Sequence, residues 1–129
     1  MKVEALDHLV LTVVDIDATV NFYADVLGME KEIFANDRVA LKFGQQKINL
    51  HQVGKEFEPK ANAPTAGSAD LCFITKTPLA QVVTHLKRQG VEIIEGPIER
   101  TGAISRLLSI YIRDPDLNLI EIANEQEKE

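Results

Sequence analysis

The sequence predicts an α+β fold built from two βαβββ modules in one chain. Each half reads as a strand, a helix and three further strands. The two halves share register: His8 and Asp70 open the first strands 62 residues apart, and Gly28 and Gly90 end the helices with the same separation. A repeat with matched register is a stronger signal than any single motif in this chain.

The domain organisation follows from this repeat. A chain of 129 residues has the length of one domain and can bury a core. Between the halves, a stretch with two prolines, two glycines and several charges has no hydrophobic period and reads as a linker. We expect module one at about 5–54, the linker at 55–68, module two at about 69–124 and a polar tail at 125–129.

The first strand and helix of module one set the direction of His8. Alternation along the strand puts His8 on one face and the neighbouring leucines on the other. Asp15 or Asp17 can cap the following helix, and Gly28 suits its C′ position. If the apolar strand face packs under the helix, His8 points away from the helix. The apolar stripe of that helix consists of Ile16, Val20, Tyr23 and Leu27.

The other elements follow from alternation and from helix-start signals. Thr77-Pro78 predicts a helix start with Thr77 as the N-cap. The residues 95–105, which contain Gly96 and Pro97, are expected to form a long loop. Strands are expected at 32–35, 38–43, 47–53, 70–75, 91–94, 107–112 and 117–123.

Composition excludes several classes of function. The net charge of −6 and the lack of a basic block argue against a nucleic-acid partner. No stretch approaches the roughly 20 apolar residues of a membrane span, and the acidic N-terminus has no signal-peptide pattern. The single cysteine, Cys72, excludes an internal disulfide and fits a reducing compartment, so we expect a cytoplasmic protein.

Several segments carry a family resemblance. DHLVLTV, NFYADVLGM and RDPDLNLIEI resemble the vicinal oxygen chelate (VOC) superfamily, the glyoxalase, bleomycin resistance and dioxygenase type. FGQQKINLHQVGKEFEPKA and GPIERTGA are similar to glyoxalase-domain-containing protein 5 and its bacterial relatives. The resemblance covers residues 5 to 124. It implies curved mixed sheets that form a metal-binding cup, and a homodimer with two-fold symmetry.

The resemblance also implies a ligand set. The first-strand positions are His8 and Asp70, and the last strand of module two gives Glu121. In module one, alignment favours Asn49, while His51 lies on the same face two residues on. Glyoxalase I has His in place of Asp70 and Glu in place of Asn49, so its own activity is not implied. Imidazole and carboxylate donors suit a divalent Mn, Fe, Co, Ni or Zn ion.

The remaining polar residues have other candidate roles. Glu121 lies between two isoleucines, where an acid needs a partner; with Asp70 it is a candidate proton shuttle. Cys72 is interpreted as filler, and Tyr111 as a packing residue. Four basic residues are either exposed or form a clamp for an anionic substrate: Arg38, Lys42, Arg100 and Arg106, the last two in or beside the long loop.

These observations predict a metal-dependent isomerase or lyase of the glyoxalase type, acting on a small substrate with vicinal oxygens. One alternative is a metal-free protein that sequesters a ligand, as bleomycin-resistance proteins do. A second is an extradiol-type dioxygenase, which needs two His and one carboxylate and would have to use His51. No residue selects the substrate.

Overall fold

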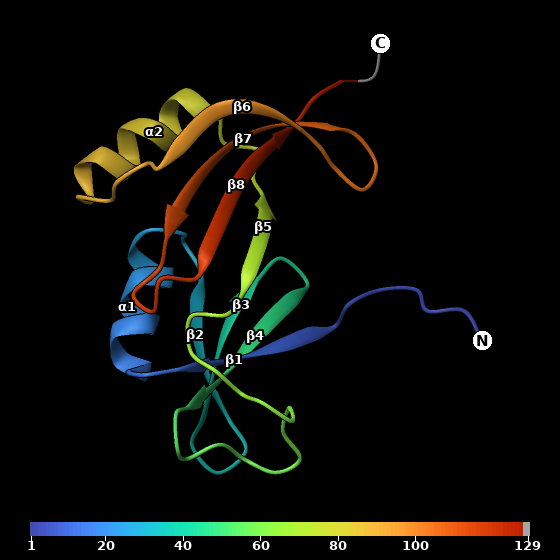
Figure 1. The fold of residues 1–129 in the computed structure, drawn as a ribbon, viewed down its shortest axis with the longest axis vertical. Coiled ribbons are helices and arrows are strands. Elements are labelled where there is room, and N and C mark those ends of the chain that lie inside the picture. Colours follow the sequence, from blue (N-terminus) through green and yellow to red (C-terminus); the bar gives the residue numbers. More distant parts are fainter. Residues whose placement is uncertain (128–129) are drawn as a thin grey trace. The chain divides into compact units, whose positions relative to one another are not determined.

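The computed structural model describes residues 1–127 and divides into two compact units, Met1–Ser68 and Ala69–Glu129. Each unit contains one four-stranded mixed sheet and one helix, as predicted (Figure 1). The α+β class with two βαβββ modules is therefore confirmed. No helix among the described residues is both long and apolar enough to cross a membrane.

The first unit has the strand order β1-β4-β3-β2, with β1 and β4 parallel and the other pairs antiparallel. The Asp15 carboxylate accepts a hydrogen bond from the Ala18 N–H at 3.1 Å, so Asp15 rather than Asp17 caps the helix. Leu11, Val13 and Tyr23 are buried in the core of this unit. Its elements are β1 (His8–Val13), α1 (Ile16–Asp25), β2 (Glu30–Phe34), β3 (Arg38–Phe43) and β4 (Gln46–Gln52).

The second unit repeats this topology, with the order β5-β8-β7-β6 and a parallel β5–β8 pair. Gly28 and Gly90 follow the two helices with the same φ of +71°, which explains why glycine occupies both positions. Ile110, Ile112 and Ile120 are fully buried. Its elements are β5 (Asp70–Ile74), α2 (Leu79–Arg88), β6 (Glu95–Thr101), β7 (Arg106–Arg113) and β8 (Leu119–Glu125).

Two local predictions for the second unit were wrong. The expected strand at 91–94 is absent, and most of the expected loop at 95–105 is strand β6. Gly96 and Pro97 lie in this edge strand at a register shift between Glu95 and Ile98, a place where sheets tolerate both residue types. The remaining loop is confined to residues 102–105.

The predicted Thr77 cap was also wrong. Pro78 is the N-cap of α2 and provides no side-chain hydrogen bond. Instead, the Leu79 N–H donates to the Asn124 side chain at 2.9 Å. The Asn124 amide also donates to the carbonyls of Thr75 and Thr77, both at 2.9 Å. A residue of β8 therefore holds the start of α2.

The segments expected as linker and tail lie at the ends of the two units. The linker residues belong to the first compact unit, which extends to Ser68. β8 runs through Glu125, where the polar tail was expected to begin. The last two tail residues, 128 and 129, lie outside the described residues.

Candidate functional site

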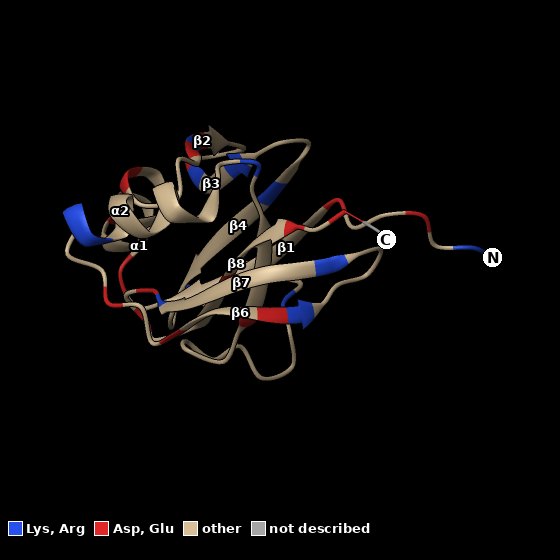
Figure 2. Cartoon of the chain, turned by 90° about the horizontal axis from the view of Figure 1, so that it is seen from above, with Lys and Arg blue, Asp and Glu red and all other residues tan. Residues whose placement is uncertain are grey.

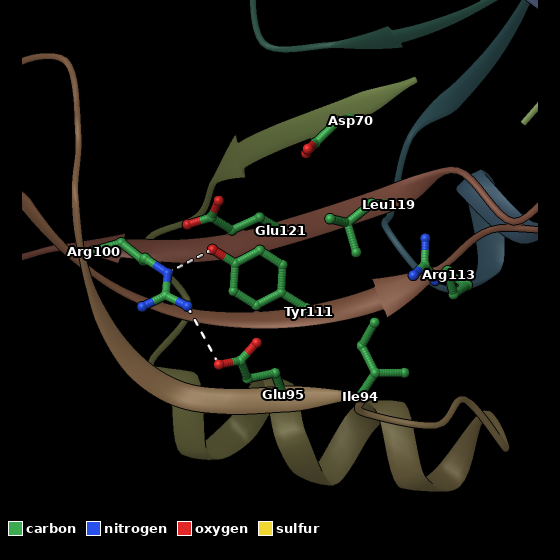
Figure 3. A pocket seen from close by; sticks show the side chains of 8 residues that line it. All are labelled: Asp70, Ile94, Glu95, Arg100, Tyr111, Arg113, Leu119 and Glu121. Carbon is green, nitrogen blue, oxygen red and sulfur yellow. Dashed lines mark hydrogen bonds and ion pairs between the residues drawn. The ribbon is translucent and has the colours of Figure 1, made fainter. Parts of the chain in front are cut away.

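A cavity of about 410 Å³ lies on the open face of the second sheet, opposite α2 (Figure 3). Asp70 and Glu121 come from the neighbouring strands β5 and β8 and both line it. Asp70 is paired with Leu119, and Glu121 with Cys72, so the two carboxylates are diagonal neighbours on one face. The lining residues are Asp70, Ile94, Glu95, Arg100, Tyr111, Arg113, Leu119 and Glu121.

Arg100 is held within this cavity by two hydrogen bonds. Its Nε donates to the Tyr111 hydroxyl oxygen at 2.9 Å, and one terminal nitrogen donates to Glu95 Oε1 at 3.3 Å. Figure 3 shows both contacts, and Figure 2 shows acidic and basic residues following one another along β6. The hydrogen bond to Tyr111 is the main reason why the pKa of Arg100 is raised, with smaller contributions from Glu95 and Glu121. The guanidinium is therefore a fixed positive charge beside the carboxylates.

Tyr111 was interpreted from the sequence as a packing residue, but its hydroxyl lies at the cavity. Because that oxygen accepts a hydrogen bond from Arg100, the hydroxyl hydrogen is available to another acceptor. Tyr111 lies directly opposite Glu121 in the β7–β8 ladder. Alternation along β7 puts Tyr111 on the same face as Ser109 and Arg113, but only the strand register shows that it lies next to Glu121.

Cys72 lies directly across the strand pair from Glu121. Burial, the negative charge of Glu121 and a hydrogen bond to it raise the pKa of the thiol to about 11, with a smaller contribution from Asp70. The thiol is therefore protonated at neutral pH, which makes it a poor nucleophile. This agrees with the interpretation that Cys72 is not a nucleophile, but the residue is exposed and so is not a packing filler.

In the first unit, His8 lies at the start of β1 with its side chain 44% exposed. Its Nδ1 is 2.8 Å from Asp7 Oδ2. A carboxylate at Nδ1 favours the tautomer in which Nδ1 carries the hydrogen and Nε2 has a free lone pair. Histidines that bind metals usually have this kind of partner on the other ring nitrogen.

The strand register distinguishes Asn49 from His51. Asn49 pairs with Val10 in the parallel β1–β4 ladder, as Glu121 pairs with Cys72 in β5–β8. Asn49 is thus the structural equivalent of Glu121. It is 6% exposed, and its Oδ1 has no hydrogen-bond partner within the described residues.

His51 lies two residues further along β4, opposite Thr12. It is therefore four residues from the position of His8, or about 13 Å along the strand pair. Its Nε2 is 3.1 Å from an Arg38 nitrogen, and it therefore accepts a hydrogen bond from Arg38. Burial, and then the charge of Arg38, lower the pKa of His51. The structure does not bring His51 and His8 together.

The predicted clamp residues separate into two groups. Arg100 lines the cavity, whereas Arg38 contacts His51 and lies over the rings of Phe34 and Phe57 at 5.3 and 4.6 Å from the centroids. Lys42 is exposed on β3. Arg106 alternates with Leu107 and so lies on the opposite face of β7 from the cavity.

The donor set is compatible with a divalent metal but is incomplete in either unit alone. Among the described residues, neither unit by itself gathers three His, Cys, Asp or Glu side chains that could hold a metal ion. The second unit offers two carboxylates on the same face of neighbouring strands, and the first offers an imidazole whose Nε2 has no partner among the described contacts. Nitrogen and oxygen donors of this kind suit first-row divalent ions.

A model of the Glyoxalase/Bleomycin resistance protein/Dioxygenase superfamily matches residues 5–122. The chain belongs to this superfamily. The recognition made from the sequence motifs is therefore confirmed. The match covers both units and includes His8, Asp70 and Glu121, although it does not assign a reaction, because one fold can support many chemistries.

Three curated relatives match nearly the whole chain. Virulence protein STM3117 of Salmonella typhimurium is 59% identical over 95% of this chain and 85% of the relative. Glyoxalase domain-containing protein RDO1 of Mycosarcoma maydis is 53% identical over 98% of this chain and 72% of its own length. Metallothiol transferase FosB of Staphylococcus epidermidis is 27% identical, with 95% and 82% covered.

Solved structures support the same relationship. The crystal structure of STM3117 superposes with a TM-score of 0.96 at 58% identity, covering 98% of this chain and all of the other. The lactoylglutathione lyase of Agrobacterium tumefaciens superposes with a TM-score of 0.72 at 25% identity, and 96% of each chain is covered.

Proposed function

We propose that this protein is a metal-dependent enzyme of the glyoxalase type, an isomerase or lyase acting on a small substrate with vicinal oxygens. The main support is the cavity of the second unit, which is lined by the carboxylates of Asp70 and Glu121, a tyrosine hydroxyl and a fixed guanidinium. Relatives named as a lactoylglutathione lyase and a metallothiol transferase make this class of chemistry plausible.

The proposed metal ligands are those that the family resemblance implies: His8, Asp70 and Glu121, with Asn49 at the fourth position and His51 as the other candidate. The ion, one of Mn, Fe, Co, Ni or Zn, would act as a Lewis acid on the two substrate oxygens. The pairing of His8 with Asp7 supports this role, since it leaves Nε2 free.

Glu121 is the proposed proton shuttle. Its carboxylate lies opposite Tyr111 in the ladder and lines the cavity, so it can take a proton from a substrate carbon and return it to the neighbouring carbon. Asp70 is the second candidate for this role. The Tyr111 hydroxyl, which receives a hydrogen bond from Arg100, can donate its own hydrogen to a substrate oxygen as negative charge develops there.

Paired substitutions test the roles of Glu121 and His8. On a confirmed substrate, Glu121→Gln should lower kcat by at least 100-fold, because the amide cannot carry a proton. His8→Ala should act mainly by lowering metal affinity. Glu99→Gln, an exposed isosteric change on β6, is the matched control and should leave turnover unchanged. If Glu121→Gln keeps full activity, Glu121 is not the proton shuttle and Asp70 becomes the candidate.

Two alternatives depend on particular observations. A metal-free protein that sequesters a ligand is favoured by the incomplete donor set within each unit. An extradiol-type dioxygenase requires His51 as the second histidine, and the contact of its Nε2 with Arg38 argues against that role. We also propose a cytoplasmic homodimer without a nucleic-acid partner, and light scattering at micromolar concentration tests the dimer.

A further inference from the structure

A second cavity, of about 610 Å³, lies on the same face of the second unit. Arg100 and Glu121 line both this cavity and the first one, so the two cavities adjoin at these side chains. Its wall includes the loop between β6 and β7 and the end of the edge strand β5. The lining residues are Cys72, Ile74, Arg100, Thr101, Gly102, Ala103, Ile104, Ser105, Leu107, Glu121 and Glu125.

The two cavities differ in chemistry. Six of the eight residues that line the first carry charged or hydroxyl groups, whereas the second adds Ile74, Ala103, Ile104 and Leu107. Ile74 is 50% exposed and Ile104 is 74% exposed. Large apolar side chains left open to water around a hollow are typical of a binding site, because an apolar group that covers them is favoured by the hydrophobic effect.

The loop that carries Ile104 is tightly constrained. The Gly102 N–H donates to the Ser105 carbonyl at 2.8 Å, and the Ser105 hydroxyl donates to the Arg106 carbonyl at 3.1 Å. A Cβ at position 102 would lie 2.7 Å from the Ser105 carbonyl oxygen and 2.9 Å from Leu107, so only glycine fits there without a shift. A wall of fixed shape costs little conformational entropy when a ligand binds.

We propose that the second cavity binds the apolar arm of the substrate, an aryl or branched aliphatic group, while the oxygen-bearing head lies in the first cavity beside Glu121 and Arg100. This inference rests on the proposed function and names its substrate class: a molecule with vicinal oxygens attached to an apolar substituent. A substrate with only a polar head would leave Ile74 and Ile104 in water.

Titration with the dye 8-anilinonaphthalene-1-sulfonate, in the presence of a chelator, tests whether the second cavity binds an apolar group when no metal is bound. The wild-type chain should bind the dye with a blue-shifted emission, and Ile104→Ser and Ile74→Ser should each weaken binding at least tenfold. Ile33→Ser is the matched control: it removes another exposed isoleucine, on β2, and should change nothing. Unchanged binding in both cavity variants would overturn the proposal.

Two probes that carry the same pair of vicinal hydroxyl groups test whether one ligand occupies both cavities. With Zn²⁺ present, 4-tert-butylcatechol should bind at least tenfold more tightly than catechol, and Ile104→Ser should bring the ratio close to one. If the wild-type chain binds catechol and 4-tert-butylcatechol equally tightly, the second cavity does not bind an apolar substituent, but the proposed function still stands. If the dye binds but neither catechol does, the oxygen-binding head, and with it the proposed function and this substrate class, is overturned.

A second copy of the chain is the competing occupant of this surface. In that case, Ile104→Ser would lower the mass measured by light scattering from dimer to monomer, and the dye would bind only to the variant. Either result would overturn the substrate arm. A variant that keeps the wild-type mass but loses the dye supports it.

Discussion

At the scale of single residues, the two sheets hold their half-buried arginines in different ways. In the second unit, Arg100 is fixed by Tyr111 and Glu95 at the edge of an open cavity. In the first unit, Arg38 is engaged by His51 and by the ring of Phe57 from the linker segment. The first arrangement leaves a cation that a ligand can reach, whereas the second places both Arg38 and His51 against the ring of Phe57.

The His51 environment predicts how stability depends on pH. Burial, and then Arg38, lower its pKa in the folded chain from the ordinary value of 6.5. Below about pH 6.5, the unfolded chain therefore binds more protons, so the free energy of unfolding should fall as the pH drops from 7.5 to 5.5. Urea unfolding of the chelator-treated protein, measured across this range, checks the slope.

Two variants make this prediction specific. His51→Gln should flatten the dependence on pH, because the amide can still accept from Arg38 but does not titrate. Arg38→Gln should flatten it less, since burial is the larger cause of the lowered pKa. An identical slope in wild type and His51→Gln would show that other groups cause the dependence.

At the scale of elements, long-range hydrogen bonds define the ends of the secondary structure. Asn124 of β8 satisfies the first backbone donor of α2 and two carbonyls of the connection before it. Likewise, Oδ1 of Asn118 in the β7–β8 turn accepts a hydrogen bond from the Ala69 N–H, just before β5, at 2.8 Å. Each contact joins segments that no local sequence pattern connects.

The capping role of Asn124 is testable by substitution. Asn124→Ala should lower the free energy of unfolding by roughly 2–4 kcal/mol, because it removes three hydrogen bonds and leaves partly buried backbone groups unpaired. Thr77→Ala, at the residue that the sequence suggested as the cap, should cost less than about 0.5 kcal/mol. Urea denaturation measures both. Similar losses in the two variants would contradict the assignment.

The β2–β3 turn offers a stabilising substitution. The Arg38 N–H donates to the Ala35 carbonyl at 3.0 Å, and the central residues Asn36 and Asp37 have φ of 41° and 67°. Both values are positive, as in a type I′ turn, which prefers Asn-Gly. Asp37→Gly should therefore raise the free energy of unfolding by about 0.5–1 kcal/mol. A fall in the thermal midpoint would contradict this description of the turn.

At the scale of the whole molecule, alternation, helix stripes and the 62-residue repeat were enough to predict the fold. Strand β6 was missed because Gly96 and Pro97 look like loop residues until an edge strand with a bulge accommodates them. The Arg100–Tyr111 contact depends on the register of β6 and β7, which no local pattern reveals. His8 and Asp70 became candidates because the repeat gives them matching positions, and Glu121 because the family motif includes it; all three remain predictions.

Calorimetric titration of the chelator-treated chain with Mn²⁺, Zn²⁺ or Ni²⁺ tests the proposal that a divalent metal binds at His8, Asp70 and Glu121. We expect about one ion per chain, and a thermal midpoint that rises with the metal, since a ligand at 100 times Kd stabilises by about 2.7 kcal/mol. His8→Ala and Glu121→Gln should weaken binding, while Glu99→Gln should not. If the chain takes up none of these ions and its thermal midpoint does not change, the proposed metal site is wrong and metal-free ligand sequestration is favoured.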